Sequence, residues 1–213
     1  IPLCLVGSEM CIRDRLGDIE ADEDNLNAAD RAYDQAVSLN PNFFYPLLRS
    51  GVINERQSRI STAKRRLNRS LELLETAEAY NTLGAIAERE GNLRQAEELY
   101  ARAAQDSGVA GQTALTSLVS LRSKSNPAAL VSMRWGVGAD GKVLIEATNK
   151  TPRTLMGIDL QIRLVDAQGI SRSYNQRLVG LSPGEVTLVS TGLRPGSGQV
   201  QLSIASIETV QGG

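Results

Sequence analysis

The chain has 213 residues, more than the usual single domain of about 100 to 150, so two domains are expected. Its net charge of −1 gives no electrostatic reason to expect nucleic acid or an anionic membrane as a partner, and no apolar run approaches the roughly 18 residues of a transmembrane segment. The chain lacks histidine, which excludes Ser-His-Asp and Cys-His nucleophile pairs, His-containing zinc sites and the HExxH helix. We therefore expect no enzyme activity, no metal and no cofactor in this chain.

Residues 1–15, IPLCLVGSEMCIRDR, fit poorly with the helical pattern that follows. Arg13 stands where the first helix should need an aromatic side chain. The stretch resembles translated sequencing adapter, a peptide found at the ends of many unrelated metagenomic translations, so we expect it to be non-native. The alternative is the apolar tail of a signal peptide, but no basic region precedes it and no small-x-small cleavage site follows. Both cysteines, Cys4 and Cys11, lie in this stretch, and we expect neither a disulfide nor a metal pair from them.

Six helices are predicted from apolar and small residues that recur at helical spacing. Their expected bounds are 10–24, 26–38, 43–57, 60–74, 77–90 and 93–106. Gly84 recurs upstream as Gly51 and Gly17, at steps of 33 and 34 residues, and Ala96 recurs as Ala63 and Ala29 at the same steps. Because small side chains let two antiparallel helices approach closely, this recurrence predicts three stacked helical hairpins.

The clearest repeat, residues 77–104, has the spacing Tyr80-x2-Leu83-Gly84-x2-Ala87 followed by Ala96-x3-Tyr100. This order of aromatic, Leu-Gly and small residues, then Ala and an aromatic, resembles the tetratricopeptide repeat (TPR). The resemblance implies an α-solenoid of about three hairpins over residues 16–122 and a protein or peptide as partner. Residues 109–122 predict a last helix with one apolar and one polar face, as expected for a helix that caps a repeat array.

The first helices of the hairpins are expected to line the inner face of this solenoid. Alignment on Gly51 and Gly84 predicts nine residues of a partner-binding groove there: Tyr45, Leu48, Val52, Glu55, Arg56, Asn81, Ala85, Glu88 and Arg89. Tyr45, Leu48 and Val52 are expected to act as apolar anchors of a mixed groove. Some TPR proteins capture the C-terminal carboxylate of a peptide with Lys, Asn and Arg side chains on this face. Here only Asn81 and Arg89 suggest such a carboxylate site. The alternative is that some of the nine residues only contact the next repeat.

The pattern changes after a polar, proline-containing segment, residues 123–130, which is predicted to be a linker. Beyond it apolar residues alternate with period two and are separated by turn residues, which indicates an antiparallel β-sandwich over residues 131–213. The predicted fold class is therefore α+β in two domains. The segments VLIEATN (143–149), LQIRLVDAQG (160–169) and LSPGE (181–185) resemble small bacterial sandwich modules of the FxLYD type, although no aromatic residue occupies the middle of the long strand.

Two short motifs in this region have simpler interpretations than their formal matches. Residues 136–141, GVGADG, satisfy the GxGxxG pattern, but a dinucleotide site needs that motif to open a helix. Because the residues that follow read as a strand, we predict a hairpin turn. Asn149-Lys-Thr151 matches a glycosylation acceptor, but nothing else in the sequence indicates a eukaryotic secretory protein.

The order of TPR repeats, capping helix and small β-sandwich resembles the C-terminal part of bacterial envelope metalloproteases of the HExxH class. The resemblance covers about residues 16–210 and rests on this order, on Phe43-Phe44-Tyr45 and on Leu73-Leu74-x-Thr76-Ala77. It implies a non-catalytic, recruiting part of a zinc protease whose catalytic domain would lie upstream in cis. The alternative is a stand-alone periplasmic TPR scaffold or lipoprotein adaptor in envelope assembly. The expected location is the bacterial periplasm or envelope, and otherwise the cytoplasm.

Overall fold

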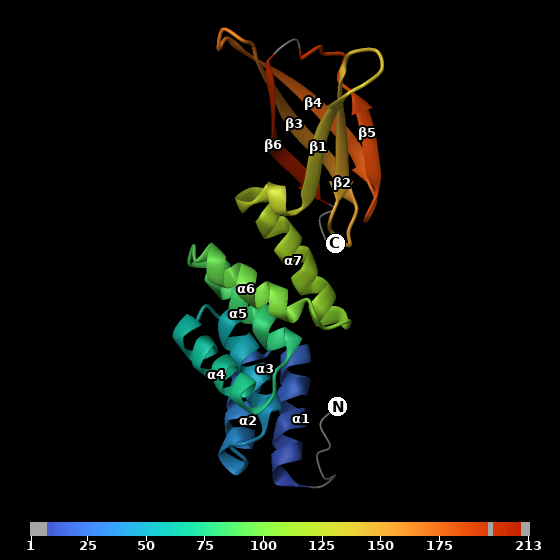
Figure 1. Ribbon diagram of the computed structural model, residues 1–213. Coiled ribbons are helices and arrows are strands. Elements are labelled where there is room, and N and C mark those ends of the chain that lie inside the picture. Colours follow the sequence, from blue (N-terminus) through green and yellow to red (C-terminus); the bar gives the residue numbers. More distant parts are fainter. Residues whose placement is uncertain (1–7, 196–197, 210–213) are drawn as a thin grey trace. The chain divides into compact units, whose positions relative to one another are not determined.

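The computed structural model describes residues 8–195 and 198–209. Within them, seven α-helices precede six β-strands (Figure 1). The chain divides into two compact units between Leu115 and Thr116, and each is described by itself. None of the helices in these ranges combines the length and the apolar character that crossing a membrane requires.

Six helices form three antiparallel hairpins, as the sequence predicts. The pairs are α1 (Glu9–Asp22) with α2 (Leu26–Leu39), α3 (Phe44–Arg56) with α4 (Ile60–Leu73), and α5 (Ala77–Arg89) with α6 (Leu93–Ala103). The helices begin and end at the expected turn residues. Thr76 Oγ1 accepts a hydrogen bond from the Ala79 amide at the start of α5, and Gly91, with φ of 78°, follows its end.

Helix α1 includes the last residues of the stretch 1–15, in agreement with the predicted helix over 10–24. It begins at Glu9, with Ser8 as its N-cap, so the last residues of that stretch are continuous with the first repeat. Cys11 is disulfide-bonded, contrary to the prediction, and Cys4 lies outside the described residues. The non-native origin of residues 1–15 stays a prediction.

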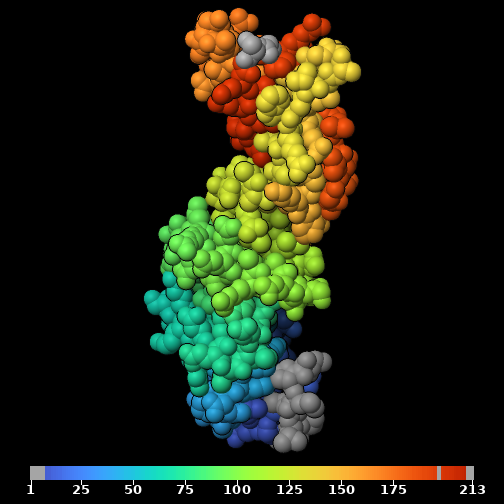
Figure 2. Space-filling view, in the orientation of Figure 1, coloured from blue at the N-terminus to red at the C-terminus, as the bar shows by residue number. Residues whose placement is uncertain are grey.

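The three recurring glycines lie at three equivalent helix crossings. A Cβ atom added to Gly17 would lie 2.5 Å from the ring of Tyr33, and one added to Gly84 would lie 2.7 Å from the ring of Tyr100. At Gly51 the same atom would lie 2.7 Å from the Leu67 side chain. Each crossing therefore depends on the absence of a side chain on the first helix. In the space-filling view the repeats follow one another in chain order, from blue to green (Figure 2).

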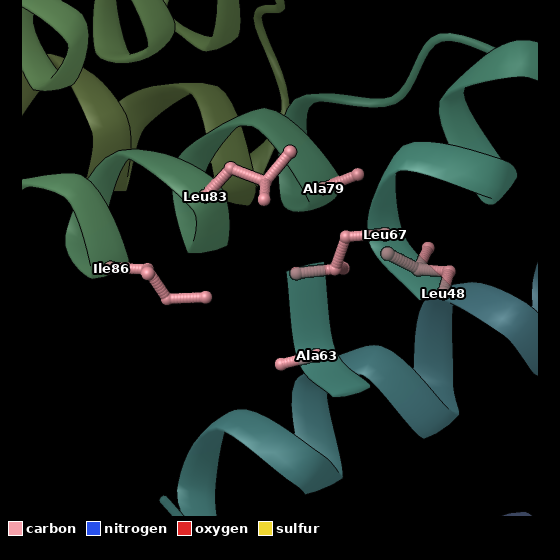
Figure 3. Packing of buried hydrophobic residues seen from close by; sticks show 6 residues of the cluster. All are labelled: Leu48, Ala63, Leu67, Ala79, Leu83 and Ile86. Carbon is pink, nitrogen blue, oxygen red and sulfur yellow. The ribbon is translucent and has the colours of Figure 1, made fainter. Parts of the chain in front are cut away.

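The second and third repeats share an apolar core, to which three helices contribute. Its buried residues are Leu48 from α3, Ala63 and Leu67 from α4, and Ala79, Leu83 and Ile86 from α5 (Figure 3). The junction between the first and second repeats is more polar. There Asp30 of α2 accepts hydrogen bonds from Ser50 Oγ at 2.7 Å and from Asn54 Nδ2 at 2.9 Å, and both partners are buried.

Helix α7 (Val109–Ser125) continues into the segment predicted to be a linker. The Ser123 and Ser125 hydroxyls donate to the backbone carbonyls of Ser120 and Leu121, so these polar residues are accommodated inside the helix. A short 3-10 helix, η1 (Pro127–Ala129), follows directly. Residues 123–130 are therefore mostly helical, and their role as a linker between the two domains stays a prediction.

The second unit contains two three-stranded antiparallel sheets, which confirms the predicted sandwich class. One sheet has the order β1 (Val131–Val137), β2 (Val143–Asn149), β5 (Val186–Ser190), and the other has the order β4 (Ser171–Leu181), β3 (Leu155–Val165), β6 (Gln199–Thr209). Alternate residues of β2 are buried, as are Ile158, Leu160 and Ile162 of β3. The period-two pattern in the sequence thus corresponds to one buried face on each sheet.

Both short motifs of this unit are structural. The GxGxxG segment forms the hairpin between β1 and β2, where the Gly138 amide donates to the Lys142 carbonyl and Gly141 has φ of 76°. The Asn149 side chain is buried and donates to the carbonyls of Arg153, Leu181 and Ser182, while its Oδ1 accepts from Thr151. Its amide nitrogen is therefore not accessible for glycosylation in this fold.

Candidate partner-binding surface

A hydrogen-bonded row connects the first helices of all three repeats. Asp18 of α1 accepts from the hydroxyl of Tyr33 at 2.7 Å and from the hydroxyl of Tyr45 at 3.1 Å. Arg49 of α3 lies between two carboxylates, with Nε 3.7 Å from Asp18 Oδ1 and a terminal nitrogen 3.3 Å from Glu78 Oε1 of α5. We call Asp18, Tyr45, Arg49 and Glu78 the inner row. It fixes polar groups from α1, α3 and α5 side by side.

The inner row holds its tyrosine in the neutral form. Burial, together with the negative charge of Asp18, raises the pKa of Tyr45 to about 12, although Arg49 opposes this rise. The hydroxyl of Tyr45 therefore remains a hydrogen-bond donor to Asp18 at neutral pH. The Arg49 side chain is half-buried and carries the only positive charge within the row. The row therefore has one guanidinium between two carboxylates and is net acidic.

Asp14, one helical turn before Asp18, lies next to this row. Its side chain is buried, and its Oδ1 has no hydrogen-bond partner among the described residues. Burial, followed by repulsion from Asp18, raises the pKa of Asp14 to about 6, although Arg49 lowers it. Asp14 belongs to the stretch 1–15, whose non-native origin stays a prediction.

The predicted apolar anchors differ in their exposure. Leu48 is only 3% exposed and lies in the core shared by the second and third repeats, so its side chain is not available to a partner in this structure. Val52 is half-buried and contacts the same core. Tyr45 is half-buried, with its ring near Phe43 and Phe44 and its hydroxyl on Asp18. Tyr45 therefore remains the aromatic group of the predicted surface, whereas Leu48 serves repeat packing.

Most charged residues of the predicted groove pair with neighbouring helices. Glu55 of α3 forms an ion pair with Arg89 of α5, and Arg56 pairs with Asp24 at 2.8 Å. Glu88 accepts a hydrogen bond from the Tyr100 hydroxyl at 2.9 Å. These contacts tie successive helices together and leave Arg56 and Arg89 exposed to solvent.

The two remaining predicted residues lie on α5. Asn81 is half-buried, and its Oδ1 is enclosed without a hydrogen-bond donor among the described residues. Ala85, one turn further along, is half-exposed and small. The Asn81 oxygen is therefore a polar acceptor one helical turn from the small side chain of Ala85. The Ala85 carbonyl in turn accepts from Arg89, which pairs with Glu55.

Asp18, Arg49 and Glu78 were not among the predicted site residues. Two of them occupy positions equivalent to predicted ones: Asp18 follows Gly17 as Val52 follows Gly51, and Glu78 precedes Gly84 by the same six residues that separate Tyr45 from Gly51. Extension of the alignment to the first repeat could have found Asp18, and transfer of the Tyr45 position to the third repeat could have found Glu78. Within residues 8–195 and 198–209, no group of three or more His, Cys, Asp or Glu side chains could hold a metal ion.

Comparisons with known proteins agree with the architecture of the helical unit. The family model described as tetratricopeptide repeat matches residues 12–43 and 77–105, which correspond to the first and third hairpins. The helical region is therefore built from TPR repeats. The second hairpin lies outside the matched residues, but its Gly51 and Leu67 make the same crossing as the glycine and tyrosine of its neighbours.

Among solved structures, the chain is similar to the crystal structure of MamA protein. The two share 24% sequence identity with a TM-score of 0.45, over 53% of this chain and 62% of that chain. The chain thus spans less than two thirds of the length of that structure. No curated protein matches the chain significantly.

Proposed function

We propose that the surface formed by the first helices α1, α3 and α5 binds a protein or peptide partner. The observation that carries this proposal is the inner row, because it places a carboxylate, a phenol, a guanidinium and a second carboxylate from three successive repeats on one surface. TPR repeats in the helical region support a partner that is a polypeptide. The positions with available side chains are Tyr45, Arg49, Glu78, Asn81, Ala85 and Arg89.

We further propose that the chain is the recruiting, non-catalytic part of a bacterial envelope metalloprotease and works in the periplasm. What supports this is the resemblance in the order of repeats, capping helix and sandwich, together with the absence of histidine from the sequence. We likewise propose that the second unit is a sandwich module of the FxLYD type, because residues 143–149, 160–169 and 181–185 resemble such modules. A stand-alone periplasmic scaffold or lipoprotein adaptor is the alternative. An HExxH helix in the coding frame upstream of Leu16 would support the protease, whereas a lipobox there would support the adaptor.

Site-specific photo-crosslinking tests the binding surface directly. A photoreactive residue replaces Asn81, Ala85 or Arg89 on α5 in one set, and exposed Arg65, Asn68 or Glu72 on α4 in a matched set. We expect a discrete crosslinked polypeptide from the α5 set and none from the α4 set. The purified partner should then bind the Tyr45→Ala variant at least several-fold more weakly than the unmodified chain. Crosslinking from α4 alone, or an unchanged Kd for Tyr45→Ala, would move the binding site elsewhere.

A further inference from the structure

One face of α1 carries an apolar stripe that the described protein leaves open. Ile12, Leu16 and Ile19 are four and three residues apart, so they share one side of the helix. Their exposed fractions are 59%, 39% and 56%. Single exposed apolar side chains are common on soluble proteins, but a contiguous row on one helix face indicates an interaction surface.

The equivalent positions are buried in both other repeats. Counted from the three glycines, the stripe corresponds to Pro46, Ser50 and Ile53 in α3, and to Ala79, Leu83 and Ile86 in α5. All six of these residues are buried. The difference between the repeats is therefore one of surroundings rather than of position within the helix.

The second helix of the preceding repeat covers these positions. Ile53 packs with Ala29 and Tyr33 of α2, and the three residues of α5 pack with Ala63 and Leu67 of α4 (Figure 3). In both cases the covering helix presents an alanine and, four residues later, a large side chain. The stripe on α1 thus occupies the positions that the preceding repeat covers in α3 and α5, and no helix among the described residues covers it.

We propose that, in the natural polypeptide, the second helix of a further TPR hairpin precedes α1 and covers this stripe, of which Leu16 and Ile19 lie outside the stretch 1–15. In the described protein, residues 40–43 join α2 to α3, and residues 74–76 join α4 to α5. The proposed interface would repeat these two helix contacts on the N-terminal side of the array. The covering helix would carry an alanine and a large apolar or aromatic residue four positions apart. A repeat array grows by this kind of nearest-neighbour contact.

A second copy of the chain does not offer the matching surface. The alanine and the large residue of α2, α4 and α6 are all buried, including Ala96 and Tyr100 in the last repeat. The α1 helix of a second copy also lacks an alanine four residues before a large apolar side chain. Self-association through α1 is the competing outcome.

The test adds a hairpin of known sequence. A second copy of residues 43–75 is joined directly to Glu9, which places its α4 as far before Gly17 as α4 stands before Gly84. If the stripe is a repeat interface, the thermal midpoint of the helical unit should rise by about 5 °C or more. Two controls should lose this gain: the fusion with Leu67→Glu in the added hairpin, and the fusion with Ile19→Glu in α1. An equal midpoint in the fusion and its controls would overturn the proposal.

Two measurements on the chain without a fusion keep the proposal testable if the fusion does not fold. Ile12→Glu and Ile19→Glu should shift the thermal midpoint of the chain by less than about 2 °C, because more than half of each side chain is exposed in the described protein. A large loss would show that the stripe already has a partner within the chain. Sedimentation should show a monomer, and a dimer that Ile19→Glu dissociates would assign the stripe to a second copy and overturn the proposal.

Discussion

Asn149 joins two loops of the β-unit through its side chain. Its amide donates to carbonyls at Arg153, Leu181 and Ser182, and its carbonyl accepts from Thr151. The sequence marks this residue only as part of a formal glycosylation pattern. Its structural role depends on backbone carbonyls that lie more than thirty residues away, and no spacing in the sequence encodes that proximity.

Asn149→Ala should lower the free energy of unfolding of the β-unit by about 2 to 3 kcal/mol, because the buried Leu181 carbonyl and the part-buried Ser182 carbonyl lose this donor, and the buried Thr151 side chain loses its acceptor. Chemical unfolding followed by the fluorescence of Trp135 measures this change. Asn175→Ala, at an exposed position of β4, is the matched control and should cost less than about 0.5 kcal/mol. Equal effects of the two substitutions would mean that the Asn149 side chain does not hold the loops.

Asp14→Asn should stabilise the helical unit, and the gain should depend on pH. The pKa of Asp14 rises from 3.8 to about 6 on folding, so the folded state keeps a proton that the unfolded state has already released between these values. Stability therefore falls as the pH rises through this window, and the loss is complete above it. The difference between the Asn variant and the unmodified chain should be near zero at about pH 3.5 and on the order of 2 kcal/mol at about pH 7.

Thermal unfolding at several pH values measures the Asp14 effect. Asp22→Asn, at an exposed position of the same helix, serves as the control and should give a small difference without this pH dependence. A gain for Asp14→Asn that is the same at all pH values would mean that the carboxyl group is not desolvated as the structure indicates.

At the scale of helices and strands, periodicity predicted the hairpins well and the polar junctions poorly. Predicted helix bounds lie within three residues of the observed ones, because turn residues such as Gly91 stand between strongly periodic segments. The end of α7 was missed because its serines bond to the preceding turn instead of breaking the helix. The junction of Asp30, Ser50 and Asn54 has no apolar pattern, so periodicity could not reveal it.

Asp30→Ala should lower the stability of the helical unit by about 2 to 4 kcal/mol. The substitution leaves the buried Ser50 hydroxyl without its carboxylate and removes one acceptor of the Asn54 amide, which still reaches the Ser50 carbonyl. Urea unfolding followed by helical circular dichroism measures the change. Arg31→Ala, on the exposed side of α2, is the control and should cost about 0.5 kcal/mol or less.

A second variant separates a lost hydrogen bond from a general disturbance of α2. When Asp30→Ala is combined with Ser50→Ala and Asn54→Leu, no buried polar group is left unpaired, and part of the stability should return. If the triple variant is as unstable as the sum of the single ones, the junction is held by something other than these hydrogen bonds.

At the scale of the whole molecule, the chain consists of two units with separate cores. One core lies between helices, as at Leu67 and Ile86, and the other lies between sheets, as at Ile145 and Leu160. The change of period in the sequence predicted the two-part architecture. It could not predict which strands pair, because β2 and β5 are joined through residues that lie about forty positions apart.

Two thermal transitions should follow from these separate cores, and substitutions should act on one transition each. Asn149→Ala should lower the midpoint of one transition, and Asp30→Ala should lower the midpoint of the other. Differential scanning calorimetry of the two variants and of their combination measures this. A single transition that both substitutions shift equally would show that the two units unfold as one.

The helices that carry the candidate surface were predicted from the sequence, and partner binding there stays a prediction. Alignment on glycines placed Tyr45 and Asn81 on the first helices, where the structure has them. The same alignment could not show that Leu48 is a core residue or that Arg49 bridges two carboxylates, because both facts depend on the neighbouring repeat. Which residue of a repeat faces its neighbour and which faces a partner is decided by stacking.

Replacement of Gly17, Gly51 and Gly84 by alanine, one at a time, tests the repeat architecture on which this account depends. At an ordinary helix position such a change raises stability by about 0.8 to 1 kcal/mol, but here the new Cβ atom would meet Tyr33, Leu67 or Tyr100. Urea unfolding should therefore show a loss of about 1 to 3 kcal/mol in all three variants. An increase in stability in any of them would contradict three equivalent close crossings and the shared surface built on them.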